Sequence, residues 1–470
     1  MLIDRYPPMA LFAFVPKLLC EFEPVLRELD HLLADDAIVC RIKTDLAQRA
    51  PHSLSLGRPS TPVEVILRLL VVKRLYGWSY EEVEHFVGDS LVLRQFCRVY
   101  LEKVPDDTTL LRWANVIEPA TLTALNERVV ALARALQVTR GRKLRLDSTV
   151  VETIVHHPSD SSLLQDGVRV VSRLLRRAKT VLGEAAGLGQ HVFRTRTRSA
   201  RRLVQSLHRL GRRKGEAAAH AMRRAYARLI AITEAVQHQA VKVSAALRGR
   251  AGAAAQRLAG QLAIFLPRVA RVVTQATRRT LQGETVPAAE KIVSLFEPHT
   301  QIIVRHKAGK PVEFGRKLWL EEVDGGLVSG WRVLDAPGPD AAYLMPSLAA
   351  HQERFGKPPR LVTADRGVFS PQNEERATQA GVTRVVIPAA GRASTAERAR
   401  QEKQRWFRRG FRFRAGIEGR ISVLQRCYEL DRCRDHGDSG MARWVGWGIV
   451  TANLERIART RVERATRRAA

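Results

Sequence analysis

The apolar and polar positions in the first part of the chain predict a series of short helices. Pro62 opens an apolar run with three- and four-residue steps that stops at Gly77, as expected for a helix with proline at its start and glycine after its end. Ser79 and Glu82 have the spacing of a capping box for a second helix. We expect a third helix with Thr108 as its cap. Three such helices are equally consistent with a helix-turn-helix unit and with a plain helical packing domain.

The pattern then changes to a strand and back to helices. Residues 143–151 have the pattern of a strand, and Asp147 falls at its end. From about residue 163 to residue 282 apolar residues again recur at three- and four-residue steps. Gly249 and Gly252 divide this stretch into two long runs. We expect a helical hairpin or a small coiled-coil bundle, with a polar face rich in arginine.

The last part of the chain alternates strands with helices. Apolar stretches at 312–323 and 327–334, joined by the turn residues Asp324-Gly325-Gly326, predict a β-hairpin. Beyond it the pattern predicts, in order, a helix at about 340–355, a strand at 360–364 that ends in Asp365, a helix at about 371–380, a strand at 384–387 and mostly helix from 398 to 466.

The composition indicates a globular protein with an unusual charge. Of its 470 residues 45% are hydrophobic and 27% are charged, which excludes a disordered or collagen-like chain. At this length we expect about two to four domains. Lys and Arg exceed Asp and Glu by 31, and residues 166–290 and 401–470 carry +19 and +9 of that excess. Such a charge is typical of a protein that binds a polyanion, although an arginine-favouring, GC-rich genome would also raise it.

The cysteines and the apolar segments favour the cytoplasm. The five cysteines have neither C-x-x-C spacing nor a histidine partner at finger spacing, which excludes a disulfide framework and a zinc finger. No apolar stretch is long and uninterrupted enough to span a bilayer. We therefore expect a cytoplasmic protein, associated with the nucleoid and with no membrane partner.

Without the arginine-rich helices, the order of elements is that of a ribonuclease H-like core, a mixed α/β fold. In that fold one acid ends the first strand, a second follows the fourth strand and a third lies on the last core helix. Asp147, Asp365 and Glu418 occupy these places. The expected domains are a helical N-terminal domain for DNA binding or dimerisation (1–137), the catalytic core (138–165 and 291–435), an arginine-rich, all-helical insertion (166–290) and a basic helical C-terminal segment (436–470).

Three carboxylates in these places suit metal-dependent chemistry on DNA. Two Mg²⁺ ions can activate a water or a 3′-hydroxyl and stabilise the leaving oxygen of a phosphodiester, and Mg²⁺ prefers oxygen ligands. Each acid also has a simpler explanation. An aspartate after a strand commonly caps a turn, and Glu418 lies four residues after Arg414, as in a surface ion pair on a helix.

These residues resemble those of a known family. Phe411, Arg414, Glu418 and Gln425 resemble the Tyr-x2-Arg-x3-Glu-x6-Lys signature of bacterial insertion-sequence DDE transposases, with Phe in place of Tyr and Gln in place of Lys. The segment 144–169 resembles the first-acid motif of the ISNCY group, and residues 363–367 resemble the second-acid motif. The helices at 60–115 are similar to the N-terminal domain of many of these enzymes.

The resemblance implies an enzyme that binds the terminal inverted repeats of an insertion sequence and performs metal-dependent strand cleavage and transfer. Asp147, Asp365 and Glu418 would be catalytic and would hold two Mg²⁺ or Mn²⁺ ions. Arg414 would contact DNA phosphate or brace Glu418. The partners would be double-stranded DNA, both terminal repeats and target, and further copies of the chain in a homodimer or larger assembly. Phe411 cannot supply the hydroxyl of the signature, and Gln425 cannot supply its cation. Arg420 or Arg426 would take over the missing positive charge.

The arginine-rich insertion has a second predicted role. We expect it to hold DNA through phosphate contacts that position the duplex without reading its sequence, and a solvated basic face is the alternative. The cations assigned to this role are Arg194, Arg196, Arg198, Arg201, Arg202, Arg212, Arg213 and Lys214. Two other functions fit the sequence: a non-catalytic, domesticated DNA-binding protein, and a ribonuclease H-like nuclease. Metal-dependent nicking would exclude the first, and strand joining would exclude the second.

Overall fold

A computed structural model describes residues 3–4, 22–49, 52, 54–55, 60–183, 188–307, 310–335, 338–389 and 395–470. The chain forms two compact units. The first comprises Met1–Glu152 and Arg316–Ala470, and the second comprises Thr153–Gly315. The chain therefore leaves the first unit within one strand and returns to it within another.

The N-terminal part of the first unit is helical. α5 begins after Pro62 and ends at Gly77, which has the left-handed conformation (φ 67°), and Ser79 and Glu82 form the capping box of α6, as predicted. The cap of α8 is Asp106, so the prediction of Thr108 was wrong; Thr108 instead donates its hydroxyl proton to the Asp106 carboxylate. The helices are α3 (Pro24–Leu33), α4 (Asp36–Ala47), α5 (Val63–Tyr76), α6 (Tyr80–Asp89), α7 (Leu91–Phe96), α8 (Asp107–Val116) and α9 (Pro119–Ala135).

The described residues form a mixed, seven-stranded sheet in the order β2-β3-β1-β5-β6, with β4 beside β3 and β7 beside β1. β3 is antiparallel to β2 and β4, while β5 is parallel to β1 and β6. The predicted hairpin is confirmed as β3 and β4, whereas β2 and β7 were not predicted. The strands are β1 (Lys143–Thr153), β2 (Gln301–Lys307), β3 (Lys310–Val323), β4 (Leu327–Val333), β5 (Leu361–Thr363), β6 (Arg384–Val386) and β7 (Arg432–Cys433).

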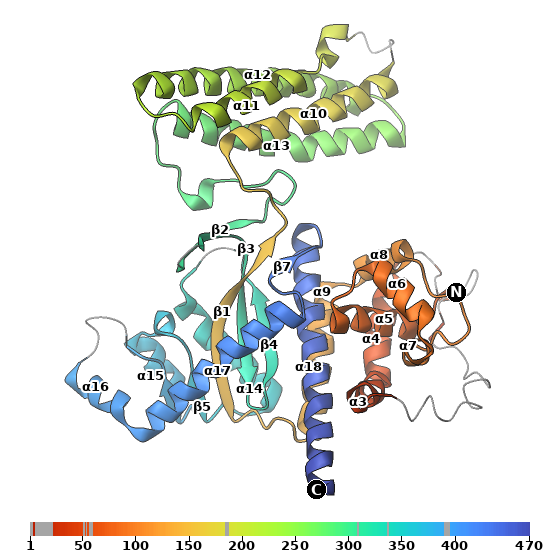
Figure 1. Ribbon diagram of the computed structural model, residues 1–470, viewed down its shortest axis with the longest axis vertical. Coiled ribbons are helices and arrows are strands. Elements are labelled where there is room, and N and C mark those ends of the chain that lie inside the picture. The colour runs from red at the N-terminus through yellow and green to blue at the C-terminus, as the bar shows by residue number, and fades with distance from the viewer. Residues whose placement is uncertain are drawn as a thin grey trace. The chain divides into compact units, whose positions relative to one another are not determined.

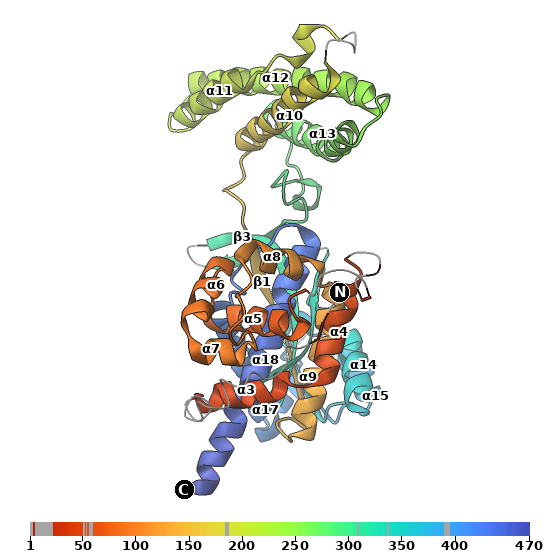
Figure 2. The same cartoon turned by 90° about the vertical axis from the view of Figure 1, so that its right-hand side faces the viewer.

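Helices from the last third of the chain complete the first unit. α17 packs against β5 and β6, and α18 lies beside α9 in Figures 1 and 2 and also contacts α3 and α5. One apolar core joins the N-terminal helices to the sheet and includes Leu69, Trp319, Val362 and Trp447. These elements are η4 (Asp340–Tyr343), α14 (Leu344–Phe355), η5 (Arg366–Val368), α15 (Pro371–Gln379), α16 (Ala396–Lys403), α17 (Arg405–Cys427) and α18 (Gly437–Ala469).

The second unit contains a bundle of four helices that lie side by side in Figure 2. Its core is separate from that of the first unit and includes Leu164, Val171, Leu229 and Leu262. Gly249 and Gly252 separate the two longest helices, as predicted. The elements are α10 (Asp160–Leu182), η2 (Gln190–Phe193), α11 (Thr197–Leu210), α12 (Glu216–Arg248), α13 (Ala253–Thr280) and η3 (Ala288–Glu290). Among the described residues no helix combines the length and apolar character needed to cross a bilayer.

Candidate active site

Asp147 lies in the middle part of β1, not at a strand end as predicted, because the strand continues through the buried residues Val150 and Val151 to Thr153. β1 pairs with β5 only through Lys143–Arg145, so Asp147 lies just beyond that ladder. Its side chain is 15% exposed. Its Oδ1 accepts a hydrogen bond from the Ser148 amide at 2.8 Å, which leaves Oδ2 for other partners.

Asp365 lies just after β5 and caps the short helix η5 through its Oδ1, which accepts the Gly367 amide proton. The simpler explanation of this residue as a turn cap is therefore correct for one of its oxygens. The other oxygen, Oδ2, lies 4.0 Å from Nη2 of Arg414, and the side chain is 48% exposed. Capping fixes the carboxylate while leaving one oxygen available.

Arg414 on α17 contacts all three predicted acids. Its Nη1 lies 3.3 Å from Oε1 of Glu418, so the expected pair along the helix is formed. Its Nη2 lies 3.5 Å from Oδ2 of Asp147 and 4.0 Å from Oδ2 of Asp365. The Arg414 side chain is 16% exposed, and its buried Nε has no hydrogen-bond partner among the described residues. One guanidinium thus gathers carboxylates from β1, the loop after β5 and α17.

The electrostatics of this cluster centre on Asp147. Burial raises the pKa of the Asp147 carboxyl, and the negative charges of Asp365 and Glu418 raise it further. The Ser148 amide and the Arg414 guanidinium act in the opposite direction and lower that pKa. The three carboxylates therefore repel one another, and a cation among them lowers the cost of keeping all three ionised.

Three carboxylates are the kind of oxygen ligand that a divalent ion of the Mg²⁺ class prefers, so the chemistry of the donor set suits such an ion. Among the described residues, no three acidic, histidine or cysteine side chains stand close enough together to hold a metal ion. The acids are paired with Arg414 instead. Asp147, Asp365 and Glu418 would have to supply the oxygen ligands of such an ion, and each of them is within 4.0 Å of Arg414.

The departures from the transposase signature have structural counterparts. Gln425 donates from Nε2 to Oγ1 of Thr149 at 3.1 Å, so it joins α17 to β1 on the side of the acids. Phe411 is partly exposed. Arg420 is turned toward the buried carboxylate of Glu322, at 3.5 Å, and cannot at the same time replace the missing cation.

The cations predicted to contact DNA lie in the second unit, on α11 and on the segments before and after it. Seven of the eight are exposed, and Arg196 is half-buried. No ion pair joins any of the eight to an acid within the described part of the chain. By contrast, Arg169 and Arg278 in the same unit pair with Asp166 and with Glu284 and Glu290.

Comparison with known proteins matches one segment of the chain. Residues 18–115, which include α3 to α7 and most of α8, match the family model described as Transposase domain (DUF772). This match supports a transposase-family protein. The segment does not include Asp147, Asp365 or Glu418. No curated protein and no solved structure matches the chain.

Proposed function

We propose that the protein is a DDE transposase that cuts and joins double-stranded DNA at the terminal inverted repeats of an insertion sequence. The observation that carries this proposal is the convergence of Asp147, Asp365 and Glu418 on Arg414, from three elements far apart in sequence. The match of residues 18–115 to a transposase domain supports the same conclusion independently, because it involves none of these residues.

The sheet supports a ribonuclease H-like core. An antiparallel pair, β4 and β3, is followed by β1 and then by the parallel strands β5 and β6. The acids lie on the central strand, after its parallel neighbour and on a helix that packs against β5 and β6. This is the placement expected of the three acids in that fold, apart from Asp147 lying within its strand.

In this proposal Asp147, Asp365 and Glu418 would hold two Mg²⁺ or Mn²⁺ ions, which would activate the attacking hydroxyl and stabilise the leaving oxygen. The chain's own groups prepare the site. Ser148 and Gly367 fix one oxygen of each aspartate through backbone amides. Arg414 partly neutralises the three acids, with which it forms ion pairs. Joining two DNA ends requires both to be held at once, so we propose a homodimer or larger assembly.

The direct test is incubation of the full chain with Mg²⁺ and a supercoiled plasmid that carries its gene and the flanking DNA, followed by mapping of nicked and joined products. The variants Asp147→Asn, Asp365→Asn and Glu418→Gln should each abolish cleavage while DNA binding persists, because removing one ligand disables the whole site. Glu463→Gln, on an exposed part of α18, removes the same charge as a control and should cleave normally.

Two results would contradict this proposal. Cleavage that survives all three substitutions would place the chemistry elsewhere. Metal-dependent nicking without joined products, at any DNA end offered, would favour a nuclease over a transposase.

We further propose that the basic segment around α11 holds DNA by its phosphates. Its eight cations have no acid partner among the described residues, so they are available to a polyanion at no cost in broken ion pairs. Removing the cation from one phosphate should lower the slope of log K against log salt by about 0.9. The triple variant Arg212→Gln, Arg213→Gln, Lys214→Gln should therefore weaken binding to every sequence and lower the slope by up to about 2.7.

The second unit offers a control for this experiment. Arg169 and Arg278 also carry positive charge but are paired with acids. The double variant Arg169→Gln, Arg278→Gln should lower the slope by less per charge removed than the triple variant does. An unchanged slope in the triple variant would mean that this segment does not contact DNA.

A further inference from the structure

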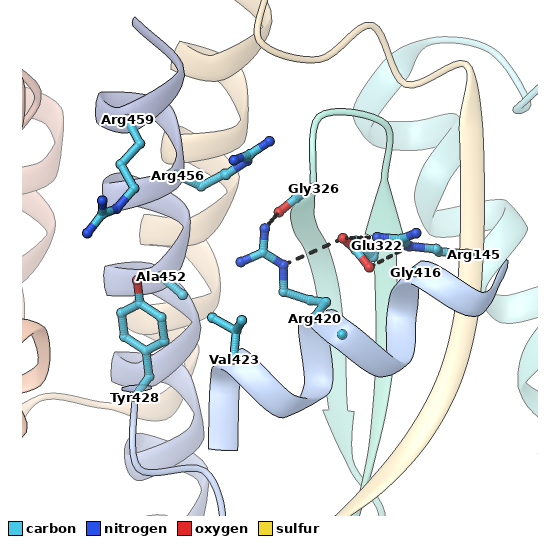
Figure 3. Close-up of a pocket in the computed structure, with 11 residues that line it drawn as sticks. Arg145, Glu322, Gly326, Gly416, Arg420, Val423, Tyr428, Ala452, Arg456 and Arg459 are labelled. Atoms are coloured by element: carbon cyan, nitrogen blue, oxygen red, sulfur yellow. Dashed lines mark hydrogen bonds and ion pairs between the residues drawn. The ribbon is translucent and has the colours of Figure 1, made fainter. Parts of the chain in front are cut away.

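A buried carboxylate links the elements that carry the first and third acids. Glu322 on β3 has a side chain only 1% exposed and lies between two arginines, as Figure 3 shows. Arg145 on β1 donates to both of its oxygens at 2.6 Å, and Nε of Arg420 on α17 lies 3.5 Å from Oε1. Three elements thus meet at one carboxylate.

Arg145 extends this link to the residue beside Arg414. Its Nη1 donates to the carbonyl of Phe413 at 2.7 Å, and its guanidinium lies 4.7 Å from the centre of the Phe413 ring. Arg145 also precedes Asp147 by two residues on β1, so the two side chains project from the same face of the strand. Arg145 therefore contacts the helix that carries Arg414 and Glu418 and lies on the strand face that carries Asp147.

Two glycines allow this close approach. A Cβ at Gly416 would overlap Nη1 of Arg145, so glycine at this position of α17 leaves room for the guanidinium where it bonds Glu322 and Phe413. Arg420 also donates to the carbonyl of Gly326, a residue with φ 78°, where a side chain would meet the Arg420 guanidinium. These residues line a cavity of about 330 Å³ beside α17 (Figure 3).

We propose that Arg145, Glu322 and Arg420 are positioning residues, which set α17 against β1 so that Arg414 and Glu418 meet Asp147. This inference rests on the proposed function, because it assigns the network to the assembly of that site. A buried ion network of this kind is costly to desolvate and gains only when its geometry is satisfied, so it favours one placement of α17 over others.

A neighbouring residue provides a matched control. Glu321 precedes Glu322 on β3, is equally buried and also lies between two arginines, with Arg354 at 2.9 Å and Arg332 at 3.3 Å. Its side chain projects from the opposite face of the strand, and none of its described partners lies on α17. Loss of either carboxylate removes the same charge from the same strand, but only Glu322 is joined to α17.

The experiment compares Glu322→Gln with Glu321→Gln in the full chain by titration with Mn²⁺, followed calorimetrically. Substituting a residue that orients metal ligands typically weakens metal binding by about 10–100-fold. We expect that loss for Glu322→Gln and a change of less than about threefold for Glu321→Gln. Arg145→Lys keeps the charge but loses the fork that reaches Phe413, and should give an intermediate loss.

A second measurement reports the geometry directly. Fe²⁺ with ascorbate and peroxide generates radicals that cut the polypeptide near a bound ion. In the unmodified chain the cuts should fall in β1, after β5 and in α17. In Glu322→Gln the cut in α17 should fall relative to that in β1, because α17 would no longer be held beside the ion. Circular dichroism establishes whether each variant is folded. If Glu322→Gln does not fold, Arg145→Lys is compared with Glu321→Gln in its place.

The outcomes separate this inference from the proposed function. Equal Mn²⁺ affinities for the two glutamine variants, with the α17 cut retained, would overturn the positioning role and leave the proposed function intact. Failure of the unmodified chain to bind Mn²⁺ in the presence or absence of DNA would overturn the proposed function, and with it this inference.

Discussion

The two units of this protein use arginine in opposite ways. In the first unit several arginines are buried and paired with acids, as in the pairs Arg74 with Glu429, Arg145 with Glu322 and Arg398 with Glu374. In the second unit the cations around α11 are mostly exposed and have no acid partner within the described residues. Arginines of the first unit thus form ion pairs inside the fold, whereas the cations around α11 in the second unit lie on the protein surface.

This difference separates charge that supports folding from charge available for binding. A buried arginine that loses its carboxylate is left as an uncompensated charge, so the pair must be kept together. An exposed, unpaired arginine contributes little to stability and can release counterions when it meets phosphate. The net charge of +31 alone would not distinguish these uses, whereas burial and pairing do.

The largest effect on stability is expected at Arg74. This fully buried side chain pairs with Glu429 at 3.0 Å, donates to the carbonyl of Trp444 and stacks on the Trp444 ring. Arg74→Met should lower the free energy of unfolding of the first unit by about 3–5 kcal/mol, because Glu429 loses its nearest cation. Urea denaturation followed by circular dichroism measures this loss.

The control is Arg112→Met, on an exposed arginine, which should change the free energy of unfolding by less than about 0.5 kcal/mol. Equal losses for the two variants would contradict the distinction between buried, paired arginines and exposed ones.

A pH-dependent effect of intermediate size is expected at His351 in the first unit. Burial lowers the pKa of His351 to about 4, and its Nε2 lies 3.0 Å from the Gly141 carbonyl. In the unfolded chain His351 takes up a proton near pH 6.5, whereas in the folded chain it does so only near pH 4. The free energy of unfolding therefore falls as the pH drops from 6.5 to 4. The loss should reach about 3 kcal/mol. His351→Gln should remove most of this slope in denaturation measured across that range, and an unchanged slope would exclude His351 as its origin.

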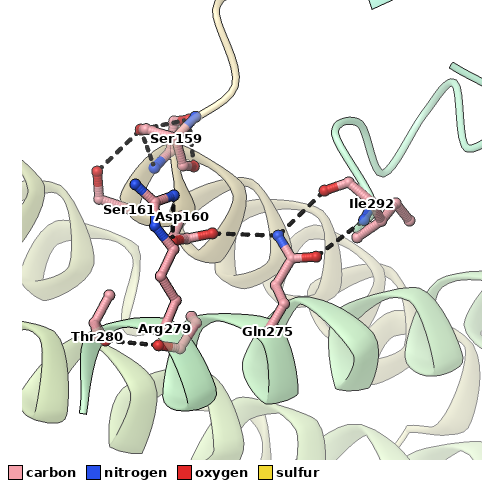
Figure 4. Close-up of polar contacts among 9 residues, drawn as sticks. Ser159, Asp160, Ser161, Gln275, Arg279, Thr280 and Ile292 are labelled. Carbon is pink, nitrogen blue, oxygen red and sulfur yellow. Dashed lines mark hydrogen bonds and ion pairs between the residues drawn. The ribbon is translucent and has the colours of Figure 1, made fainter. Parts of the chain in front are cut away.

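A smaller effect on stability is expected at Asp160, a buried carboxylate of the second unit that pairs with an arginine. Asp160 is buried at the start of α10 and accepts hydrogen bonds from Gln275 at 3.2 Å and Arg279 at 3.0 Å, as Figure 4 shows. Asp160→Asn should destabilise the second unit by about 2 kcal/mol, the usual worth of a hydrogen bond to a charged group. Asp166→Asn, which loses a pair with the exposed Arg169, should cost less than about 1 kcal/mol in the same thermal unfolding experiment.

The smallest effect on stability is expected at the three cations after α11, whose removal we expect to weaken DNA binding. The triple variant Arg212→Gln, Arg213→Gln, Lys214→Gln should change the free energy of unfolding by less than about 0.5 kcal/mol per residue, because these side chains are exposed and unpaired. Calorimetry without DNA measures this. A large loss would show that these cations support the bundle and would break the comparison between the units.

The sequence predicted the elements whose signals are local. Pro62 and Gly77 bound α5, the Asp-Gly-Gly turn joins β3 to β4, and the glycines after α12 end that helix. The helices α3 and α4 lie in the segment predicted to be helical, but their bounds were not predicted, and the strands β2 and β7 were not predicted at all. β2 has no turn residue of its own to mark it, and its register is set by pairing with β3. Long-range pairing of this kind leaves little trace in a single sequence.

The site was predicted only in part for the same reason. The order of elements and the family resemblance indicated Asp147, Asp365 and Glu418, and the helix spacing indicated the pair of Arg414 with Glu418. The reach of Arg414 to Asp147, 267 residues away, and the bond of Arg145 to Glu322, 177 residues away, depend on the folded sheet. Strand alternation placed Arg145 on the face of Asp147, which was the one available signal.

The second unit is joined to the first through two neighbouring strands, so it can be gained or replaced as one piece. The chain leaves the first unit on β1 and re-enters on β3, and these strands are hydrogen-bonded neighbours. Neighbouring strands lie about 4.8 Å apart, a gap that a short turn closes. The segment Thr153–Gly315 is therefore an insertion between two neighbouring strands of the sheet, β1 and β3. Evolution could acquire, exchange or discard this segment without reordering the sheet, and a designer could insert a different domain between the same two strands.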